Sequence, residues 1–249
     1  MVDPWLLAVL FCGAALLYAS VGHAGASAYL AIMGLFGVAP DAARPTALAL
    51  NVFVASFVTY RFWRSGHVSW RSLAPFLLGS IPFAFLGGAL PIAPGLYKKL
   101  VGIVLLFAAA GMALTARRAA GAETSRAAPR VPAAPAVGIG ATIGLVSGLT
   151  GTGGGIFLSP VLLFAGWAQT RAASGLAAPF ILGNSIAGLA GSFARLAAVP
   201  SSLPVWIGAV VVGAAIGSEI GSRRGRIELL RSALALVLFI AGLKLIFVG

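Results

Sequence analysis

Long, nearly uncharged apolar blocks constrain this chain more than any other feature of its sequence. Of its 249 residues, 60% are hydrophobic and only 9% are charged, whereas an average soluble domain has roughly 25% charged residues. The apolar residues form runs of about 18 or more, long enough to cross the hydrocarbon core of a bilayer as a helix. The short alternating segments of a transmembrane β-barrel are absent from the sequence. We therefore predict an all-α polytopic membrane protein.

The apolar blocks fall into two similar halves. Each half contains an interrupted apolar stretch, which we divide into two short helices, followed by three full-length spans. The interrupted stretches cover about 4–38 and 134–167, and the spans cover about 45–63, 72–91, 98–116, 172–194, 203–221 and 228–248. This internal repeat of about 130 residues predicts a first transmembrane repeat over 1–116, a cytoplasmic linker over 117–133 and a second repeat over 134–249.

The distribution of basic residues predicts that the two repeats are inverted. With five helical pieces in each half, the second half begins on the opposite side of the membrane from the first. Twelve of the 17 Lys and Arg residues then lie on the linker side, which the positive-inside rule makes cytoplasmic. The other five lie outside, with both termini: Arg44, Lys98, Lys99, Arg195 and Lys244.

An alternative topology treats each interrupted stretch as a single crossing, which makes the repeats parallel. The basic residues then divide eight to nine and the bias disappears, so we favour inversion. The charges do not distinguish re-entrant hairpins from pairs of thin spans at 4–38 and 134–167, because both return the chain to the same side.

Two glycine-rich breaks lie at equivalent places in the repeats, at Gly22–Ser27 and Thr150–Gly155. A helix broken inside the bilayer frees backbone groups, which are tolerated only where protein buries them or where they line a wet cavity. The short helix after each break also presents an N-terminus, whose N–H groups and positive dipole end favour an anion. We therefore predict an anion site at mid-membrane between two opposed N-termini. Glycines that only allow close helix packing are the alternative explanation.

Polar residues at the breaks and in the following spans are candidates for contacting the anion. An amide or hydroxyl within a span needs a partner, and Ser20 and Ser159 flank the breaks. His23 can bind the anion, relay a proton or serve as a hydrogen-bonded packing residue. The predicted substrate-binding residues are Gly22, His23, Ala24, Gly25, Ser27, Asn51, Thr150, Gly151, Thr152, Gly153, Gly154, Gly155, Asn184 and Ser185. Arg44 and Arg171 precede equivalent spans, where they attract anions to the two mouths or anchor the helices at the interface.

Several motifs resemble the TauE/SafE family of sulfite and organosulfur anion permeases. The second break continues as Gly153-Gly154-Gly155-Ile156-Phe157-Leu158-Ser159-Pro160, and the first half contains Ala43-Arg44-Pro45-Thr46-Ala47-Leu48. The loop Arg64-Ser65-Gly66-His67-Val68-Ser69-Trp70 is similar to the family's basic-Gly-x-Val-x-Trp loop. The first break departs from the family pattern, because Ala24 and Ala26 stand where glycine is frequent.

The resemblance implies that the anion contains sulfur, as in sulfite, thiosulfate or a small sulfonate. It also adds Thr46 to the predicted substrate-binding residues. Composition and spacing by themselves support only a small anion.

These features predict a secondary transporter that works by alternating access, with export favoured by the membrane potential. An anion channel of the same architecture and a proton-coupled importer are the alternatives. We expect no enzyme activity, cofactor or metal, because the chain has only five acidic residues and no cluster of cysteine and histidine. The net charge of +12 lies in loops, so we expect a lipid bilayer and no nucleic acid as partner. We expect the bacterial inner membrane as location and leave a homodimer open.

Overall fold

The computed structural model of the chain is helical throughout its described parts, which are residues 3–20, 22–118, 131–222 and 227–247. Its side chains are described outside 112–118, 170–171, 221–222 and 227–234. The first half forms α1 (Pro4–Ser20), α2 (Ala26–Leu35), α3 (Pro40–Arg64), α4 (Trp70–Ala89) and α5 (Pro94–Arg118). The second half forms α6 (Ala133–Thr150), α7 (Gly155–Phe164), α8 (Thr170–Gly191), the 3₁₀ helix η1 (Phe193–Ala198), α9 (Leu203–Ser222) and α10 (Ile227–Phe247).

Both interrupted stretches form a helical hairpin with a break, as the sequence predicts. The second helix of each hairpin, α2 or α7, has ten residues, which corresponds to about 15 Å, or half of the hydrocarbon core. The first helix of each hairpin is longer than the second, since α1 has 17 residues and α6 has 18; the bounds of α1 agree with the piece predicted at about 4–20. Each hairpin therefore pairs a nearly full-length helix with a half-helix. The central part of the predicted linker, 119–130, lies outside the described residues.

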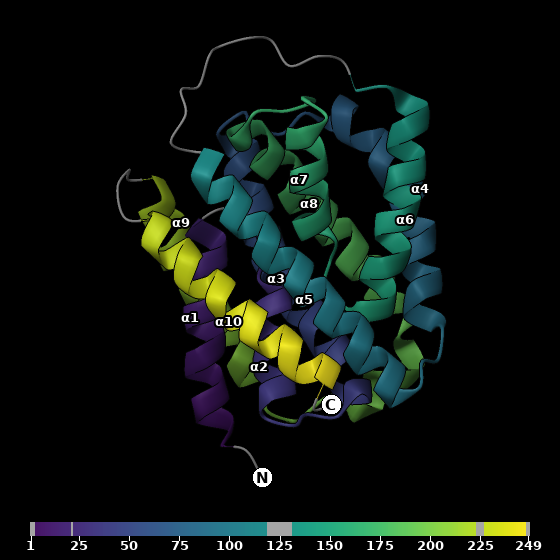
Figure 1. Cartoon of the computed structure of the whole chain (residues 1–249), viewed down its shortest axis with the longest axis vertical. Coiled ribbons are helices and arrows are strands. Elements are labelled where there is room, and N and C mark those ends of the chain that lie inside the picture. Colours follow the sequence, from purple (N-terminus) through teal and green to yellow (C-terminus); the bar gives the residue numbers. More distant parts are fainter. Residues whose placement is uncertain (1–2, 21, 119–130, 223–226, 248–249) are drawn as a thin grey trace.

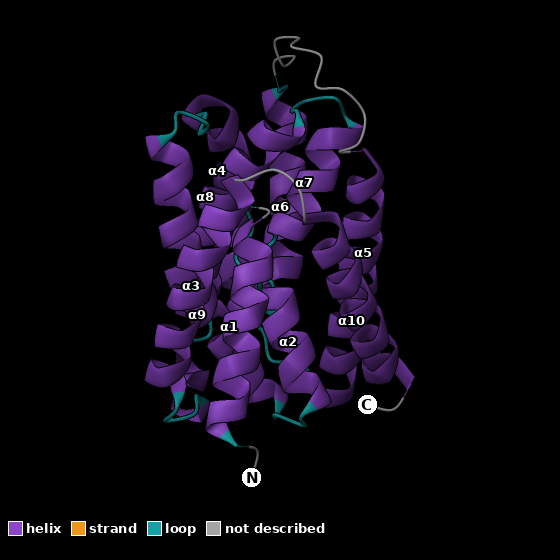
Figure 2. Ribbon diagram, turned by 90° about the vertical axis from the view of Figure 1, so that its left-hand side faces the viewer, coloured by secondary structure: helices purple, strands orange, loops and turns teal. Residues whose placement is uncertain are grey.

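The two half-helices lie toward opposite ends of the molecule. Figure 1 shows α1 beginning and α10 ending at one end, here called the terminal end, while α5 ends and α6 begins at the other, the linker end. Figures 1 and 2 show α2 toward the terminal end and α7 toward the linker end. Each break therefore lies in the interior, and this arrangement is the one expected if the two repeats are inverted.

Helices from different halves form the most extensive contacts, α4 with α6 and α1 with α9. Glycines of α6 bring its backbone against α4, so a Cβ added at Gly144 would lie 2.2 Å from the Ser80 carbonyl oxygen. In the same way, a Cβ at Gly217 of α9 would lie 2.1 Å from the Leu16 carbonyl oxygen of α1. Such close backbone packing is typical of membrane helices, where small residues replace the hydrophobic driving force.

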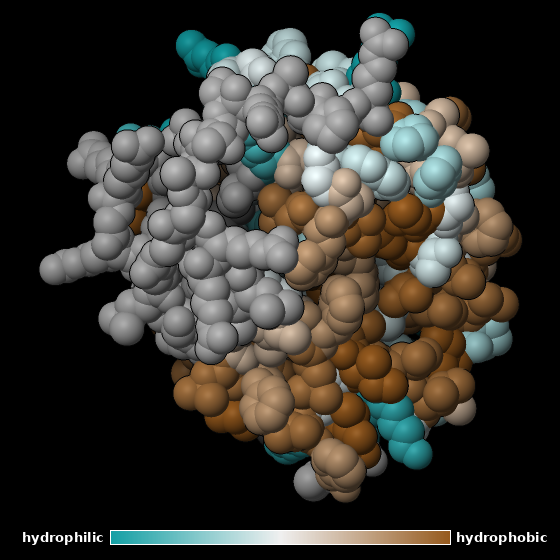
Figure 3. Space-filling view, turned by 45° about the horizontal axis from the view of Figure 1, so that its top comes forward, coloured by the Kyte–Doolittle hydropathy of each residue, from teal (hydrophilic) through white to brown (hydrophobic). Residues whose placement is uncertain are grey.

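The lipid-facing surface is apolar, in keeping with a polytopic membrane protein. Among the described residues, six helices are long and apolar enough to span a bilayer: α3, α4, α5, α6, α8 and α9. Large apolar side chains such as Leu78 and Ile103 are exposed, and Figure 3 shows apolar residues spread over the flank of the molecule. A soluble monomer rarely exposes so large an apolar surface. Near the linker end, Arg61 of α3 and Glu219 of α9 form an exposed ion pair at 3.0 Å.

The α4–α6 contact predicts a position-specific effect of alanine on stability. Gly144→Ala forces the α6 backbone away from Ser80, so we expect a clearly lower melting temperature in detergent, with a cost of about 1–3 kcal/mol. Gly138→Ala on the same helix is the control, because nothing lies within 4 Å of its added Cβ, and alanine there favours the helix. Equal melting temperatures for the two variants would contradict this packing.

Candidate functional site

Each half-helix begins at a glycine in the left-handed region. Gly25, before α2, has φ 104°, and Gly154, before α7, has φ 81°; no side chain caps either helix. Residues other than glycine rarely adopt this backbone conformation. Both starting points are buried, so the first N–H groups of each helix lie in the interior without a capping oxygen. An anion satisfies such groups and is also favoured by the helix dipole.

Two tyrosine hydroxyls form hydrogen bonds at the first break, which also contacts the second half of the chain. The Tyr18 hydroxyl bonds the Ser27 hydroxyl, and the Tyr29 hydroxyl donates to the Ala24 carbonyl oxygen at 2.8 Å. His23 Nε2 lies 3.0 Å from Ser159 Oγ on α7. His23 of the first break thus comes within hydrogen-bonding distance of the opposite half-helix.

The second break is held by hydroxyl groups from two helices. Thr150 Oγ1 and Thr152 Oγ1 lie 3.0 Å apart, and Thr150 Oγ1 also donates to the Val146 carbonyl oxygen at 2.7 Å. The Tyr97 hydroxyl, from the first turn of α5, donates to the Thr150 carbonyl oxygen at 3.0 Å. Tyr97 was not predicted, because a tyrosine near the end of a span is ordinarily an interfacial anchor.

Both predicted asparagines gather at this second break, although they come from different halves of the chain. Asn51 Nδ2 of α3 lies 3.3 Å from Ser185 Oγ and 3.5 Å from the Thr152 carbonyl oxygen. A Cβ added at Gly153 would lie 2.5 Å from Asn51 Nδ2, and one added at Gly154 would lie 3.5 Å from Asn184 Nδ2. The structure therefore places Asn51, Asn184 and Ser185 around the backbone that leads into α7.

Several of these polar groups are buried without a hydrogen-bond partner among the described residues. They include Asn51 Oδ1, Asn184 Oδ1 and Thr46 Oγ1. Asn184 Nδ2, by contrast, donates to the Phe180 carbonyl oxygen at 3.0 Å. Buried polar atoms in folded proteins nearly always find a partner, so such atoms mark places for a ligand or water.

Arg44 lies next to the second break, where backbone carbonyl groups accept three of its five N–H groups. It is buried, and its Nε donates to the Gly148 carbonyl oxygen at 2.9 Å and its Nη1 to that of Leu90 at 3.2 Å. Its Nη2 donates to the Gly87 carbonyl oxygen. The guanidinium therefore joins the ends of α4 and α6 and supports the break. The side chain of Arg171, the predicted counterpart, lies outside the described residues.

The site is a buried cluster of neutral polar groups at a pair of broken helices. Within the described residues, no group of three or more His, Cys, Asp or Glu side chains is placed to hold a metal ion. Comparison with known proteins identifies the family to which this architecture belongs. The family described as "Sulfite exporter TauE/SafE" matches residues 6–245. The chain belongs to this family.

A curated relative supports the same assignment. The "Probable membrane transporter protein y4hK" of Sinorhizobium fredii (strain NBRC 101917 / NGR234) is 42% identical over 241 residues, which cover 96% of this chain and 97% of the relative. The family and the relative are both named for transport, so the chain is a membrane transporter of the TauE/SafE family. No solved structure matches the chain.

The crowding at the second break predicts a strong effect of Gly153→Ala. The new Cβ lies 2.5 Å from Asn51 Nδ2 and 2.9 Å from the Ile181 side chain, so the break must shift. Gly166→Ala is the matched control, because Gly166 also has positive φ but nothing lies within 4 Å of its added Cβ. We expect Gly166→Ala to cost only the left-handed strain of about 1–2 kcal/mol and to keep transport. Gly153→Ala should abolish transport, measured as flux into proteoliposomes. Equal transport by the two variants would contradict this prediction, because it would show that the break tolerates displacement.

Proposed function

We propose that this protein exports a small sulfur-containing anion as a secondary transporter. The observation that carries the proposal is the pair of uncapped, buried half-helix N-termini at Gly25 and Gly154. Helix N-termini at interrupted helices bind anionic groups in other secondary transporters, and inverted repeats bring two of them to one site. The sulfur in the anion is supported by the family, described as a sulfite exporter. We propose that the termini lie outside, which the basic residues favour.

The second break would supply most of the side-chain contacts to the anion. Asn51, Asn184 and Ser185 surround the backbone that leads to the α7 N-terminus. His23 would complete the site from the first repeat through its contact with Ser159 at 3.0 Å. Because both repeats contribute, a relative movement of the repeats would open the site to one side at a time.

The neutral character of these groups favours a monoanion over a dianion. Transfer of a charge from water into a low-dielectric interior is costly, and the Born cost rises with the square of the charge. The nearby cation, Arg44, bonds the carbonyl groups of Gly87, Gly148 and Leu90 through its three guanidinium nitrogens, so its guanidinium is directed to the backbone of α4 and α6. A singly charged sulfonate or hydrogensulfite fits this site better than sulfate.

Export is also the direction that the membrane potential favours. A negative interior drives an anion outward with about 2.3 kcal/mol per charge per 100 mV. Export driven by the membrane potential requires no coupling ion. This agrees with the site, because His23 and Arg44 are the ionisable residues among those proposed to form or flank it.

Proteoliposome flux of sulfite, thiosulfate and methanesulfonate tests the proposal. We expect saturable flux with counterflow exchange, and about tenfold weaker binding in Asn51→Ala, Asn184→Ala and His23→Ala, because each loses a hydrogen bond to a charged group. Ser56→Ala is the control, since Ser56 lies on the exposed face of α3 and bonds only the Val52 carbonyl oxygen.

The outcomes separate the alternatives. Lack of saturable flux for every sulfur oxyanion would contradict the transporter, and flux without counterflow exchange would favour a channel. Uptake that requires a proton gradient would favour an importer. Unchanged affinity in the three site variants would remove the side-chain contacts and leave only the backbone N–H groups as ligands.

Charge selectivity gives a separate prediction. In a counterflow assay at equal concentration, methanesulfonate should inhibit transport of the labelled substrate at least tenfold more strongly than sulfate, because the dianion loses more solvation energy. Selenate, another dianion, controls for size and should behave like sulfate. Equal inhibition by methanesulfonate and sulfate would mean that a positive charge reaches the anion during transport.

A further inference from the structure

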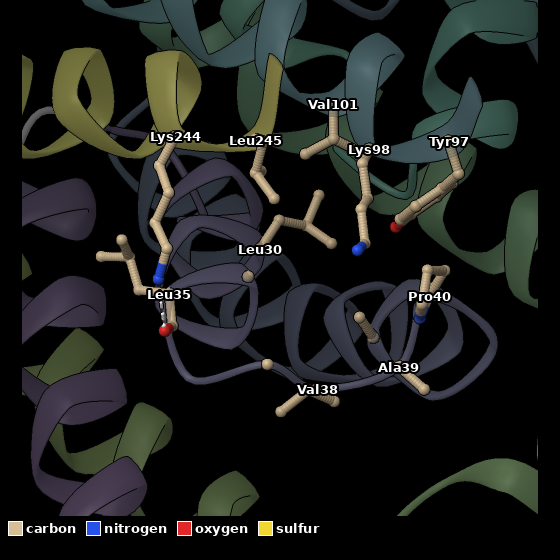
Figure 4. A pocket seen from close by; sticks show the side chains of 13 residues that line it. Leu30, Leu35, Val38, Ala39, Pro40, Tyr97, Lys98, Val101, Lys244 and Leu245 are labelled. Carbon is tan, nitrogen blue, oxygen red and sulfur yellow. Dashed lines mark hydrogen bonds between the residues drawn. The ribbon is translucent and has the colours of Figure 1, made fainter. Parts of the chain in front are cut away.

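A pocket opens between four elements at the terminal end of the molecule. Its volume is about 300 Å³, and it is lined by α2, the loop leading into α3, the first turns of α5 and the last turns of α10. Figure 4 shows Leu30, Val101 and Leu245 forming apolar walls around its centre. A volume of this order holds a small molecule with part of its hydration shell. The predicted substrate-binding residues do not line this pocket.

Two lysines give the pocket a positive charge. Lys98 and Lys244 both line it, and no carboxylate is among its lining residues. Lys244 Nζ donates to the Leu35 carbonyl oxygen at 2.9 Å, so it closes the C-terminal end of α2. The nearby carboxylate of Asp41 is turned to Arg195, whose Nε lies 3.7 Å from its Oδ1.

Lys98 has no such structural partner. It is half-buried, and the described residues offer its ammonium neither a hydrogen bond nor an ion pair. Figure 4 shows its side chain extending from α5 into the pocket, toward Leu30 and Pro40. A partly desolvated ammonium group that faces a cavity without a counter-charge attracts small anions.

The inner wall of the pocket reaches the second break. Tyr97 lines the pocket, and its hydroxyl donates to the carbonyl oxygen of Thr150, the last residue of α6 before the break. Ala43 also lines the pocket and precedes Arg44, which packs against Gly151. The Tyr97 side chain therefore links the pocket to the second break.

We propose that this pocket is a second anion-binding site, a vestibule in which Lys98 holds the transported anion between the central site and the solvent at the terminal end. The proposal rests on the proposed function, because the anion is the one carried by the central site. The ligand class is a small oxyanion, either the free substrate or the phosphate of a lipid headgroup.

The experiment compares Lys98→Gln with Lys99→Gln. Lys99 follows Lys98 in α5, is exposed and does not line the pocket, so it controls for a general change of surface charge. In proteoliposomes of phosphatidylcholine at low ionic strength, Lys98→Gln should raise the KM of the carried anion about three- to tenfold with little change in maximal rate. The difference should shrink at high salt, as charges are screened, while Lys99→Gln stays within twofold of the wild type.

A second readout does not depend on transport. Calorimetric titration of the purified protein in detergent with methanesulfonate should show a weak site that Lys98→Gln removes and that Asn184→Ala leaves intact. If the wild type binds in this way but transports no anion, the pocket stands and the proposed function fails. If the wild type transports the anion and Lys98→Gln has the same KM and the same calorimetric titration as the wild type, the proposed vestibule is wrong and the proposed transport function stands. An effect of Lys98→Gln that appears only in vesicles containing phosphatidylglycerol would identify a lipid headgroup as the ligand and overturn the substrate vestibule.

Discussion

The structure depends on how backbone groups are satisfied where two helices break inside the membrane. A bilayer offers no water to these groups, so neighbouring protein must supply the partners. Tyrosine hydroxyls do this at both breaks, since Tyr29 donates to the Ala24 carbonyl oxygen and Tyr97 to that of Thr150. The carbonyl groups are thereby covered, whereas the N–H groups at the starts of α2 and α7 have no side-chain cap. Among the backbone groups of the two breaks, this imbalance leaves N–H donors uncapped while these carbonyl acceptors are satisfied, which suits an anion.

The same requirement explains why Arg44, although it lies close to the candidate site, bonds backbone carbonyl groups. Arg44 lies nearer to the site than any lysine discussed here, yet its planar guanidinium holds the carbonyl groups that end α4 and α6. Arginine fits this role because it keeps its charge and offers several donors in fixed directions. Glycines such as Gly144 and Gly148 let α4 and α6 approach until one guanidinium can reach both. The position of Arg44 beside the second break therefore depends on the close packing of α4 against α6.

The sequence was enough to predict the helices and both breaks, because apolar length and glycine position are local signals. It also predicted that Asn51 and Asn184 would lie near a break, since an amide inside a span requires a partner. It did not predict that both amides would gather at the second break, because that follows from the packing of α3 against α8 across the repeats. Tyr97 escaped prediction for the same reason. Its contact with Thr150 joins residues 53 positions apart, and no local pattern distinguishes it from an interfacial tyrosine.

The asymmetry of the two breaks bears on how an anion could be both bound and released. A buried cation with free donors would hold an anion tightly, because the interaction is strong where water is excluded. The second break instead surrounds its half-helix with neutral amides and hydroxyls, and each guanidinium nitrogen of the nearby Arg44 bonds a backbone carbonyl group. Partial charges of helix N–H groups provide an attraction that decays within about one turn, so under the proposed function a small movement of α7 relative to Asn51 and Asn184 would change the affinity for the anion substantially. A transporter needs such a site, because its cycle requires binding that is strong enough to select the anion and weak enough to lose it.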